Sequence, residues 1–258
     1  MRMTSMNSEI SRLFDLHGRR ALVTGSGRGI GREIALTLGR AGAEILFHAT
    51  GENATLNEAV ETARKEGIAC RALTAELSRP EELPGLISEA GEIDILVLNA
   101  SVQKYQTVPE FREEDFDWQF QVNVSASFRL IEGFLRGMRE RKWGRVLAVG
   151  SVNQWKQSPR LAVYAATKSA LSNLIKNCAR NYAAEGITFN CLAPGVIATD
   201  RNREALSDHT LVETLLQGIP AKRIGTPADC AGTALLLCSD AGSYITGTDI
   251  PVAGGMQL

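Results

Sequence analysis

Residues 21–31 read Ala-Leu-Val-Thr-Gly-Ser-Gly-Arg-Gly-Ile-Gly, an apolar run that ends in a glycine-rich loop. A helical pattern begins at once near Ile30. Glycines let the backbone turn sharply and approach a ligand closely, and the first turn of a helix presents unpaired N–H groups with partial positive charge. The stretch therefore predicts a strand, a phosphate-binding loop and a helix, with a pyrophosphate as the expected ligand. A loop that only turns the chain is the alternative.

The composition limits the class of protein. The chain has 258 residues, 44% hydrophobic and 22% charged, which suits one large α/β domain. A formal net charge of -1 gives no basic field for nucleic acid. No apolar run reaches the roughly 18 residues that span a bilayer, and residues 1–8 are too polar for a signal peptide. The five cysteines form no Cys-x-x-Cys pair and the three histidines are scattered, so we expect a cytoplasmic protein with reduced thiols and no metal site.

Apolar runs alternate with helical patterns outward from the glycine loop. Runs typical of strands cover residues 20–24, 44–49, 69–75, 93–98, 145–149, 188–192 and 249–252. Helical patterns cover residues 29–41, 53–66, 80–89, 113–141, 161–184 and 227–238, the pattern over 113–141 being broken or bent along its length. This alternation predicts βαβ units and a single-domain α/β fold of Rossmann type, a doubly wound parallel sheet with helices on both faces. We expect a flexible leader over residues 1–15, then one dinucleotide-binding catalytic domain over 16–258 with a substrate flap at about 199–219.

The end of the second strand bears on the choice of cofactor. Ligands bind at the carboxyl ends of parallel strands, and folds that bind NAD often carry an acidic residue there for the ribose 2′-hydroxyl. This strand ends in Ala49 and Thr50, and Glu52 comes too late to serve. Arg28 supplies a positive charge for a 2′-phosphate and Thr50 a hydroxyl, so NADP is predicted over NAD. The alternative is that Arg28 is only solvated and His48 packs at the surface.

Four polar residues form the candidate catalytic group. Tyr164 and Lys168 are four apart in a predicted helix and therefore share one face, where a lysine cation would help to bring the phenol pKa toward neutrality. Ser151 follows a buried strand, where its hydroxyl would hold a substrate oxygen, and Asn123 is an amide placed to bond backbone or water. Each has an ordinary alternative: a chance helical pair, a strand-end cap, and a polar residue facing water. Their order along one chain behind a glycine loop favours catalysis.

Together these motifs resemble the short-chain dehydrogenase/reductase family over nearly the whole chain. The resemblance implies that Tyr164 is the general acid in reduction and that Ser151 orients the carbonyl. It implies that Lys168 lowers the Tyr164 pKa and binds the nicotinamide ribose, and that Asn123 holds a water in a proton relay. Members similar to this chain are homotetramers built through the long helices. The resemblance also assigns cofactor contacts to Gly25, Ser26, Arg28, Gly29, Ile30, Gly31, Ala49, Thr50, Glu76, Leu77, Asn99, Ala100, Ser101, Tyr164, Lys168, Pro194, Gly195, Ile197 and Thr199.

Three positions depart from the family pattern. Ser101 replaces the glycine of the family's Asn-Asn-Ala-Gly, Glu76 stands where aspartate is usual, and Ala253 stands where aspartate is common. These departures concern cofactor geometry and leave the four catalytic positions intact.

Two substrate classes stay open. Residues 49–53, 122–125 and 244–247 look like those of 3-oxoacyl carrier-protein reductases, whereas Gln103 and residues 151–154 look as much like those of sugar-acid (gluconate dehydrogenase-like) or polyol dehydrogenases using NAD or NADP. Ser151, Gln103, Gln154 and Trp155 are the candidate substrate contacts, and Lys104, Arg160 and Arg201 near the same mouth suggest a polar or anionic substrate. Glu185, at a position where a carrier-protein reductase would present a basic residue, weakens the acyl-carrier interpretation. A non-catalytic protein that senses the cofactor is a third possibility, against which the intact catalytic group argues.

Overall fold

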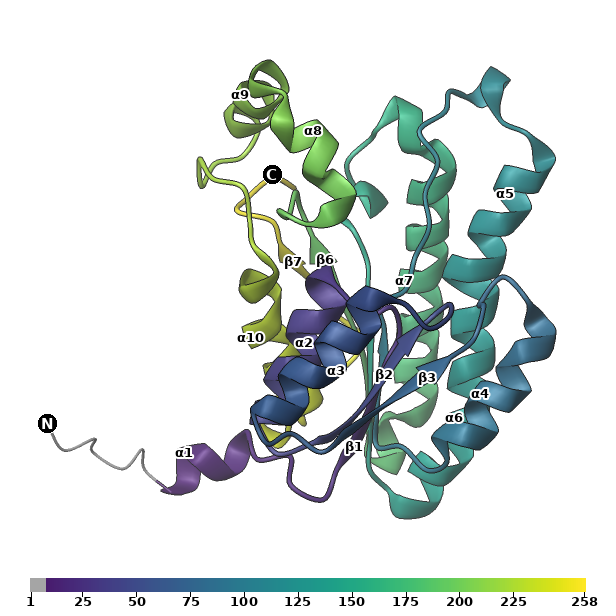
Figure 1. The fold of residues 1–258 in the computed structure, drawn as a ribbon, viewed down its shortest axis with the longest axis vertical. Helices are drawn as coiled ribbons and strands as arrows, with labels where there is room; N and C mark the ends of the chain where they lie inside the picture. Colours follow the sequence, from purple (N-terminus) through teal and green to yellow (C-terminus); the bar gives the residue numbers. More distant parts are fainter. Residues whose placement is uncertain (1–7) are drawn as a thin grey trace, which may run out of the picture.

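The computed structural model describes residues 8–258 as one α/β domain around a seven-stranded sheet in the order β3-β2-β1-β4-β5-β6-β7 (Figure 1). Every neighbouring pair of these strands is parallel. The strands are β1 (Arg20–Val23), β2 (Glu44–Ala49), β3 (Cys70–Thr74), β4 (Ile95–Leu98), β5 (Gly144–Val149), β6 (Ile187–Pro194) and β7 (Asp249–Val252). The doubly wound parallel sheet expected from the alternation of apolar runs is therefore confirmed.

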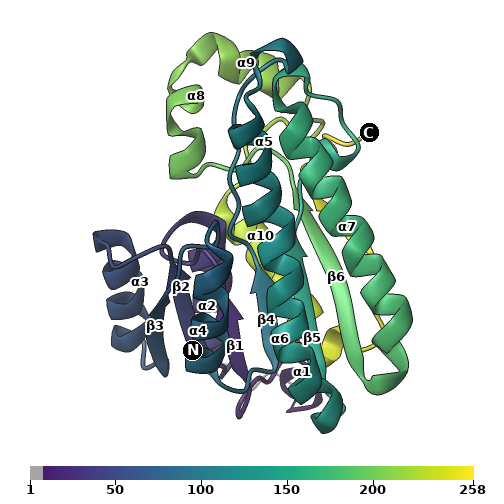
Figure 2. The same ribbon diagram turned by 90° about the vertical axis from the view of Figure 1, so that its right-hand side faces the viewer.

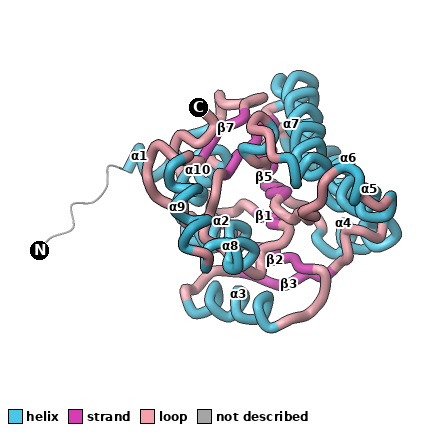
Figure 3. Tube along the Cα trace, turned by 90° about the horizontal axis from the view of Figure 1, so that it is seen from above, coloured by secondary structure: helices cyan, strands magenta, loops and turns pink. Residues whose placement is uncertain are grey.

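Helices cover both faces of the sheet (Figure 3). One layer contains α2 (Gly29–Arg40), α3 (Ala54–Lys65) and α10 (Pro227–Cys238), and the other contains α4 (Leu83–Ala90), α6 (Ala126–Arg141) and α7 (Ala162–Tyr182). Successive strand residues point to opposite faces, so β1 sends Ala21 and Val23 into the first layer's core and Leu22 into the second. Because both faces are covered, β4 and β5 are buried along their whole length, and continuous apolar runs are what such strands require.

The strand order creates the binding crevice. After β1 the chain builds β2 and β3 on one side, and then crosses to β4 on the other side. Loops leaving the carboxyl ends of β1 and β4 consequently diverge, and a crevice opens between them. The glycine loop that follows β1 lies at this point, where the sequence predicts the pyrophosphate.

The helical pattern over residues 113–141 contains the expected break. It divides into α5 (Glu113–Phe120), a π-helical segment (Gln121–Ser125) and α6, and these run on from one another (Figure 2). A π-helical turn inserts one extra residue per turn, and such insertions occur often at functional sites. Here the inserted turn contains Asn123.

The structure can be compared with two segments expected from the sequence, the leader over residues 1–15 and the flap at about 199–219. Of the expected leader over 1–15, residues 1–7 lie outside the described residues, whereas α1 (Ser8–Leu13) is a short helix and Leu16 is buried. The expected flap contains a 3-10 turn (Asp200–Asn202), α8 (Arg203–Ser207) and α9 (His209–Gln217), which stand beyond the carboxyl ends of the strands (Figures 1 and 2). No helix within residues 8–258 has the length and apolarity needed to cross a membrane.

Candidate active site

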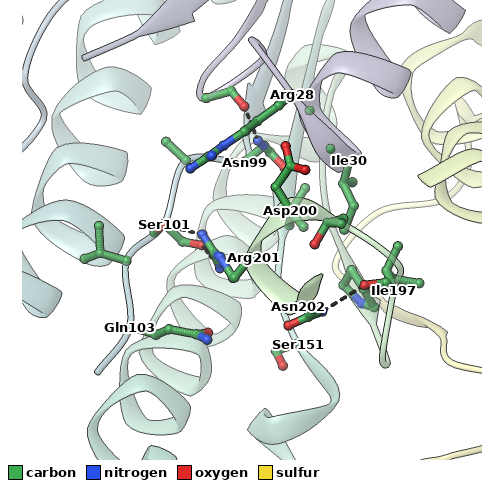
Figure 4. Close-up of a pocket in the computed structure, with 18 of the residues that line it drawn as sticks. Arg28, Ile30, Asn99, Ser101, Gln103, Ser151, Ile197, Asp200, Arg201 and Asn202 are labelled. Atoms are coloured by element: carbon green, nitrogen blue, oxygen red, sulfur yellow. Dashed lines mark hydrogen bonds between the residues drawn. The ribbon is translucent and has the colours of Figure 1, made fainter. Parts of the chain in front are cut away.

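A cavity of about 1110 Å³ lies over the carboxyl ends of the strands, between the glycine loop and the flap (Figure 4). Most of the residues predicted to bind cofactor, to catalyse or to contact substrate line it. These are Gly25, Arg28, Gly29, Ile30, Gly31, Ala49, Thr50, Glu76, Leu77, Asn99, Ala100, Ser101, Gln103, Ser151, Tyr164, Lys168, Pro194, Gly195, Ile197 and Thr199. Ser26, Asn123, Gln154 and Trp155 do not line the cavity.

The glycine loop is held against the end of β4. The Asn99 side-chain amide donates to the carbonyl oxygens of Thr24 at 2.8 Å and Gly25 at 3.0 Å. A Cβ atom at Gly31 would lie 2.3 Å from Asn99 Nδ2, so no side chain fits there. Gly25 has φ of +63°, a left-handed conformation that glycine adopts without strain. The loop therefore delivers the unpaired N–H groups at the start of α2 to the cavity as an anion site.

The donor set beside this loop fits NADP. Arg28 is exposed, lines the cavity and forms no ion pair within residues 8–258, so its guanidinium is available for a phosphate. Thr50 lines the same wall from the end of β2, whereas Glu52 does not line it. No acidic side chain at the end of β2 is therefore placed to repel a 2′-phosphate. Arg28, Thr50 and the α2 N-terminus would hold the phosphate groups.

His48 does not follow the alternative in which this histidine packs at the surface. It is only 1% exposed, because it lies between the glycine loop and the chain leaving β3. Its Nδ1 accepts from the Gly25 N–H at 3.3 Å, and its Nε2 lies 3.1 Å from the Ala75 carbonyl oxygen. A carbonyl can only accept, so Nε2 carries the proton and the ring is neutral. Burial lowers the His48 pKa to about 4, in agreement with this assignment.

Ser26, which the resemblance assigns to the cofactor, does not line the cavity. Its hydroxyl is buried and accepts from the His48 N–H at 2.9 Å, and its own N–H donates to the His48 carbonyl oxygen at 3.0 Å. The side chain is thus committed to tying the glycine loop to β2. Ser26 therefore holds the glycine loop in place through its hydrogen bonds to the His48 backbone.

Tyr164, Lys168 and Ser151 meet at the other end of the cavity. Tyr164 and Lys168 lie on one face of α7, with Lys168 Nζ 5.6 Å from the centre of the Tyr164 ring. The Lys168 ammonium is buried and donates to the Val149 carbonyl oxygen at 2.7 Å. Ser151 begins the turn after β5, and its hydroxyl accepts from the Asn153 N–H at 3.2 Å. Hydrogen bonding with this hydroxyl lowers the Tyr164 pKa.

Burial dominates the acidity of Tyr164 and Lys168. Burial raises the Tyr164 pKa above its ordinary value, and the charge of Arg201 and the Ser151 hydroxyl oppose the rise. Burial, with the Arg201 charge added, lowers the Lys168 pKa to about 7. The sequence predicts that Lys168 helps to lower the Tyr164 pKa together with the positive charge of an oxidised cofactor. Among the protein's own groups the desolvation cost of a buried phenolate exceeds the attraction of Lys168, so the charge of the cofactor would have to supply the rest.

Asn123 holds two neighbouring segments together. Its Oδ1 accepts from the Val102 N–H at 2.8 Å, and its Nδ2 donates to the Val102 carbonyl oxygen at 2.9 Å and to Thr167 Oγ1 at 3.0 Å. The prediction of an amide that bonds backbone rather than packs describes this contact well. Both amide hydrogens and one acceptor position of Oδ1 are used, so the side chain fixes the loop after β4 against α7.

The expected substrate contacts divide. Gln103 lines the cavity, whereas Gln154 turns inward: its Oε1 accepts from the Ser151 N–H at 3.4 Å in a capping box that begins at Ser151. Trp155, one residue on, is 41% exposed and does not line the cavity. The short 3-10 turn after Ser151 sets the direction of Gln154, and no sequence periodicity reports such a turn.

Several lining residues were not singled out from the sequence. They are apolar and come from distant segments: Trp118 on α5, Leu211 and Leu215 on α9, and Met256 near the C-terminus. Leu211 and Leu215 are four apart on a short polar helix, a spacing that signals one apolar face. Trp118 and Met256 carry no such signal.

A metal cluster or a nucleophilic cysteine would be an alternative source of reactivity. Within residues 8–258 no group of three or more His, Cys, Asp or Glu side chains is placed to hold a metal. Burial raises the pKa of Cys191, Cys230 and Cys238 to about 12, so these thiols are protonated and poor nucleophiles. The reactive groups of the cavity are therefore hydroxyls and an amine.

Comparisons with known proteins agree with this site. The family model described as Enoyl-(Acyl carrier protein) reductase matches residues 25–257. The 3-oxoacyl-(acyl-carrier-protein) reductase of Salmonella typhimurium is 38% identical over 242 residues, which cover 93% of this chain and 98% of the relative. The 2-dehydro-3-deoxy-D-gluconate 5-dehydrogenase of Bacillus subtilis is 35% identical over 245 residues, covering 94% of this chain and 96% of the relative.

Solved structures point the same way. The 3-oxoacyl (acyl-carrier-protein) reductase of Agrobacterium tumefaciens, crystallised with NADP bound, has a TM-score of 0.92 and 36% sequence identity, and the match covers 98% of this chain and 100% of that one. The chain belongs to the short-chain dehydrogenase/reductase family.

Proposed function

We propose that this protein is an NADP(H)-dependent oxidoreductase that interconverts a ketone and a secondary alcohol in the manner of a 3-oxoacyl reductase. The observation that carries the proposal is one continuous cavity. It has Arg28 and Thr50 at one end and Ser151, Tyr164 and Lys168 at the other. A dinucleotide bound by its phosphates at the first end reaches the second, where the proton-transferring groups lie.

The protein's residues divide the chemistry among them. When bound, NADP(H) supplies or accepts the hydride and, in its oxidised form, adds a positive charge. In reduction Tyr164 donates its hydroxyl proton to the substrate oxygen, and Ser151 donates a hydrogen bond to the same oxygen. Lys168 supports the phenol from the next turn of α7, and Asn123 is a positioning residue for the loop after β4. Two hydroxyl donors aimed at one oxygen suit a carbonyl rather than a carbon–carbon double bond.

A sugar acid or polyol is the second candidate substrate class. It is favoured by polar groups at the substrate end of the cavity, where Gln103 and Arg201 line the wall. The relative from Bacillus subtilis is named as a dehydrogenase of a sugar acid. A non-catalytic role is the remote third candidate, which the complete set of reactive groups disfavours.

An activity screen tests the proposal. We expect the purified protein to oxidise NADPH in the presence of an acetoacetyl thioester or a keto-sugar acid, with a higher kcat/KM for NADPH than for NADH. Absence of turnover with every ketone in such a panel would contradict the proposed reaction. Turnover with NADH alone would contradict only the cofactor assignment.

Assembly and location are part of the same proposal. We infer a homotetramer in the cytoplasm. A shallow groove on α6 and α7, lined by Val124, Phe128, Arg129 and Leu174, supports an interface there, because Phe128 is 50% exposed. The cysteines of residues 8–258 are all free thiols, which suits a reducing compartment.

A further inference from the structure

The charges that line the cavity are unevenly distributed. Within residues 8–258 its lining cations are Arg28, Lys168 and Arg201, and its lining carboxylates are Glu76 and Asp200. Arg28 and Glu76 lie at the nucleotide end, and the Lys168 ammonium is bonded to a backbone carbonyl. Asp200 forms an ion pair with Arg203 of the flap. Arg201 is therefore the cation left at the substrate end.

Arg201 spans the mouth of the cavity. Its Nη1 donates to Ser101 Oγ at 3.1 Å and its Nη2 donates to the Ser101 carbonyl oxygen at 2.6 Å. Figure 4 shows its side chain leaving the flap toward Ser101, with Ser151 and Gln103 on the same side. A guanidinium has five N–H donors, so these two bonds leave three. Arg201 has no carboxylate within ion-pair distance in the described part of the chain.

Arg201, Ser151 and Tyr164 line the same cavity. The positive charge of Arg201 opposes the rise that burial causes in the Tyr164 pKa, and so do hydrogen bonds with the Ser151 and Ser101 hydroxyls. A substrate oxygen held by Tyr164 and Ser151 thus lies beside a positive charge whose remaining donors form a fork that matches a carboxylate.

We propose that Arg201 binds a carboxylate of the substrate, which makes the substrate a small keto or hydroxy acid with its carboxylate close to the reacting carbon. This inference rests on the proposed oxidoreductase function and narrows its substrate class. It favours an acid over a thioester, since a thioester has no charge at that position.

The other cations near this mouth do not offer the same site. Lys104 does not line the cavity, and its Nζ lies 3.4 Å from Asp115 Oδ1. Arg160 does not line it either, and donates to the Tyr105 carbonyl oxygen at 3.3 Å. The competing role for Arg201 is mechanical: its bonds to Ser101 would latch the flap to the loop after β4 and bind no substrate. A latch affects charged and neutral substrates alike, whereas a carboxylate site affects the charged one.

A pair of ketones separates these two roles. Acetoacetate and ethyl acetoacetate present the same ketone beside a carboxylate or a neutral ester, and each consumes one NADPH and one proton per hydroxyl product. We expect Arg201→Gln to lower kcat/KM for acetoacetate by roughly 10- to 100-fold while the value for the ester changes less than about twofold. Arg203→Gln, the adjacent flap arginine, is the matched control and should preserve the preference. An equal loss for both ketones in R201Q would overturn the proposal in favour of the latch.

A binding measurement keeps the proposal testable without turnover. Calorimetric titration of both ketones into the enzyme saturated with NADP⁺, where no hydride can be delivered, should show tighter binding of acetoacetate and loss of that difference in R201Q. If neither ketone is reduced but this charge-dependent binding is seen, the proposed reaction fails and the carboxylate site stands. Equal binding of acid and ester by the wild-type protein would overturn the carboxylate site whatever the activity.

Discussion

Arg28 and Thr50 lie on one wall of the cavity, at the start of α2 and the end of β2. The pyrophosphate and the glycine loop are common to NAD and NADP binding, so the loop alone does not select between them. Arg28 has no carboxylate partner within residues 8–258, so its guanidinium is free to pair with the 2′-phosphate that only NADP carries. We therefore expect cofactor choice to depend on Arg28 and Thr50.

Replacing Arg28 should change cofactor preference without changing the loop. We expect Arg28→Ala to weaken NADPH binding by about 10- to 100-fold, the effect of losing a charge-assisted hydrogen bond to phosphate, and to leave NADH binding nearly unchanged. Arg32→Ala is the control, because Arg32 lies on the same helix but pairs with Glu58 at 3.1 Å outside the cavity. Fluorescence titration with each cofactor measures both affinities. A similar loss for both cofactors would mean that Arg28 supports the loop and does not read the 2′-phosphate.

Residue types and spacings indicated which polar side chains lie together, but they did not indicate how those side chains are oriented or how deeply they are buried. Tyr164 and Lys168 share a helix face because residues four apart must do so, and this much follows from the sequence. The direction of Gln154 does not, because a capping box in a short turn sets it. The raised pKa of Tyr164 could not be predicted from the sequence either, because it results from the burial of the phenol in the packed molecule.

Helices and strands were most predictable where their buried faces follow a regular apolar periodicity in the sequence. The boundaries of β2, β7 and α10 agree with the residue ranges expected from the sequence, because apolar periodicity and a proline at the start of α10 define them. The π-helical segment between α5 and α6 was expected only as a break of unspecified form. An inserted residue leaves little trace in helical periodicity, although here it sets the position of Asn123.

His48 joins three elements and makes the fold sensitive to acid. It connects the glycine loop, β2 and the chain after β3 while its ring is neutral. The unfolded chain protonates this histidine below about pH 6.5, whereas burial holds the folded-state pKa at about 4. The folded state therefore binds fewer protons in that interval, and its stability falls as the pH drops from about 6.5 to about 4.

This pH dependence is measurable against a variant. Between pH 7 and pH 4 we expect His48 to cost the wild-type protein about 3 kcal/mol of unfolding free energy, a component that His48→Gln should lack. Urea unfolding of both proteins at the two pH values gives the difference, since the acid sensitivity of the carboxylates is common to both. Equal pH dependence in the two proteins would show that His48 is solvated or already charged in the folded state.

At the scale of the whole molecule, the strand order fixes where function lies. The crevice beside β1, the flap beyond the strands and the Tyr164–Lys168 pair on α7 meet only because the sheet is wound in both directions. The alternation of apolar runs predicted this architecture and the carboxyl-end location of the site. It did not predict which flap side chains reach the cavity, because α8 and α9 are short and contribute no core periodicity.

The proposed tetramer has a test on the outer face of α6. Phe128→Glu places a charge at a half-exposed apolar position beside the groove on α6 and α7, so we expect the assembly to dissociate into smaller species. Val108→Glu is the control, since Val108 is 73% exposed and does not line the groove. Light scattering coupled to size-exclusion chromatography reports the mass. An unchanged tetramer in Phe128→Glu, or a monomeric wild-type protein, would contradict this interface.

In the proposed reaction Tyr164 transfers the proton, in a cavity that binds NADP(H) independently of it. Removing its hydroxyl by Tyr164→Phe tests this directly, with NADPH affinity and ketone reduction measured on the same preparation. We expect NADPH binding within about threefold of wild type and a loss of kcat of at least about 10³-fold, in the range that removal of a general acid and an oxygen-binding donor produces together. Turnover near the wild-type rate in this variant would contradict the account.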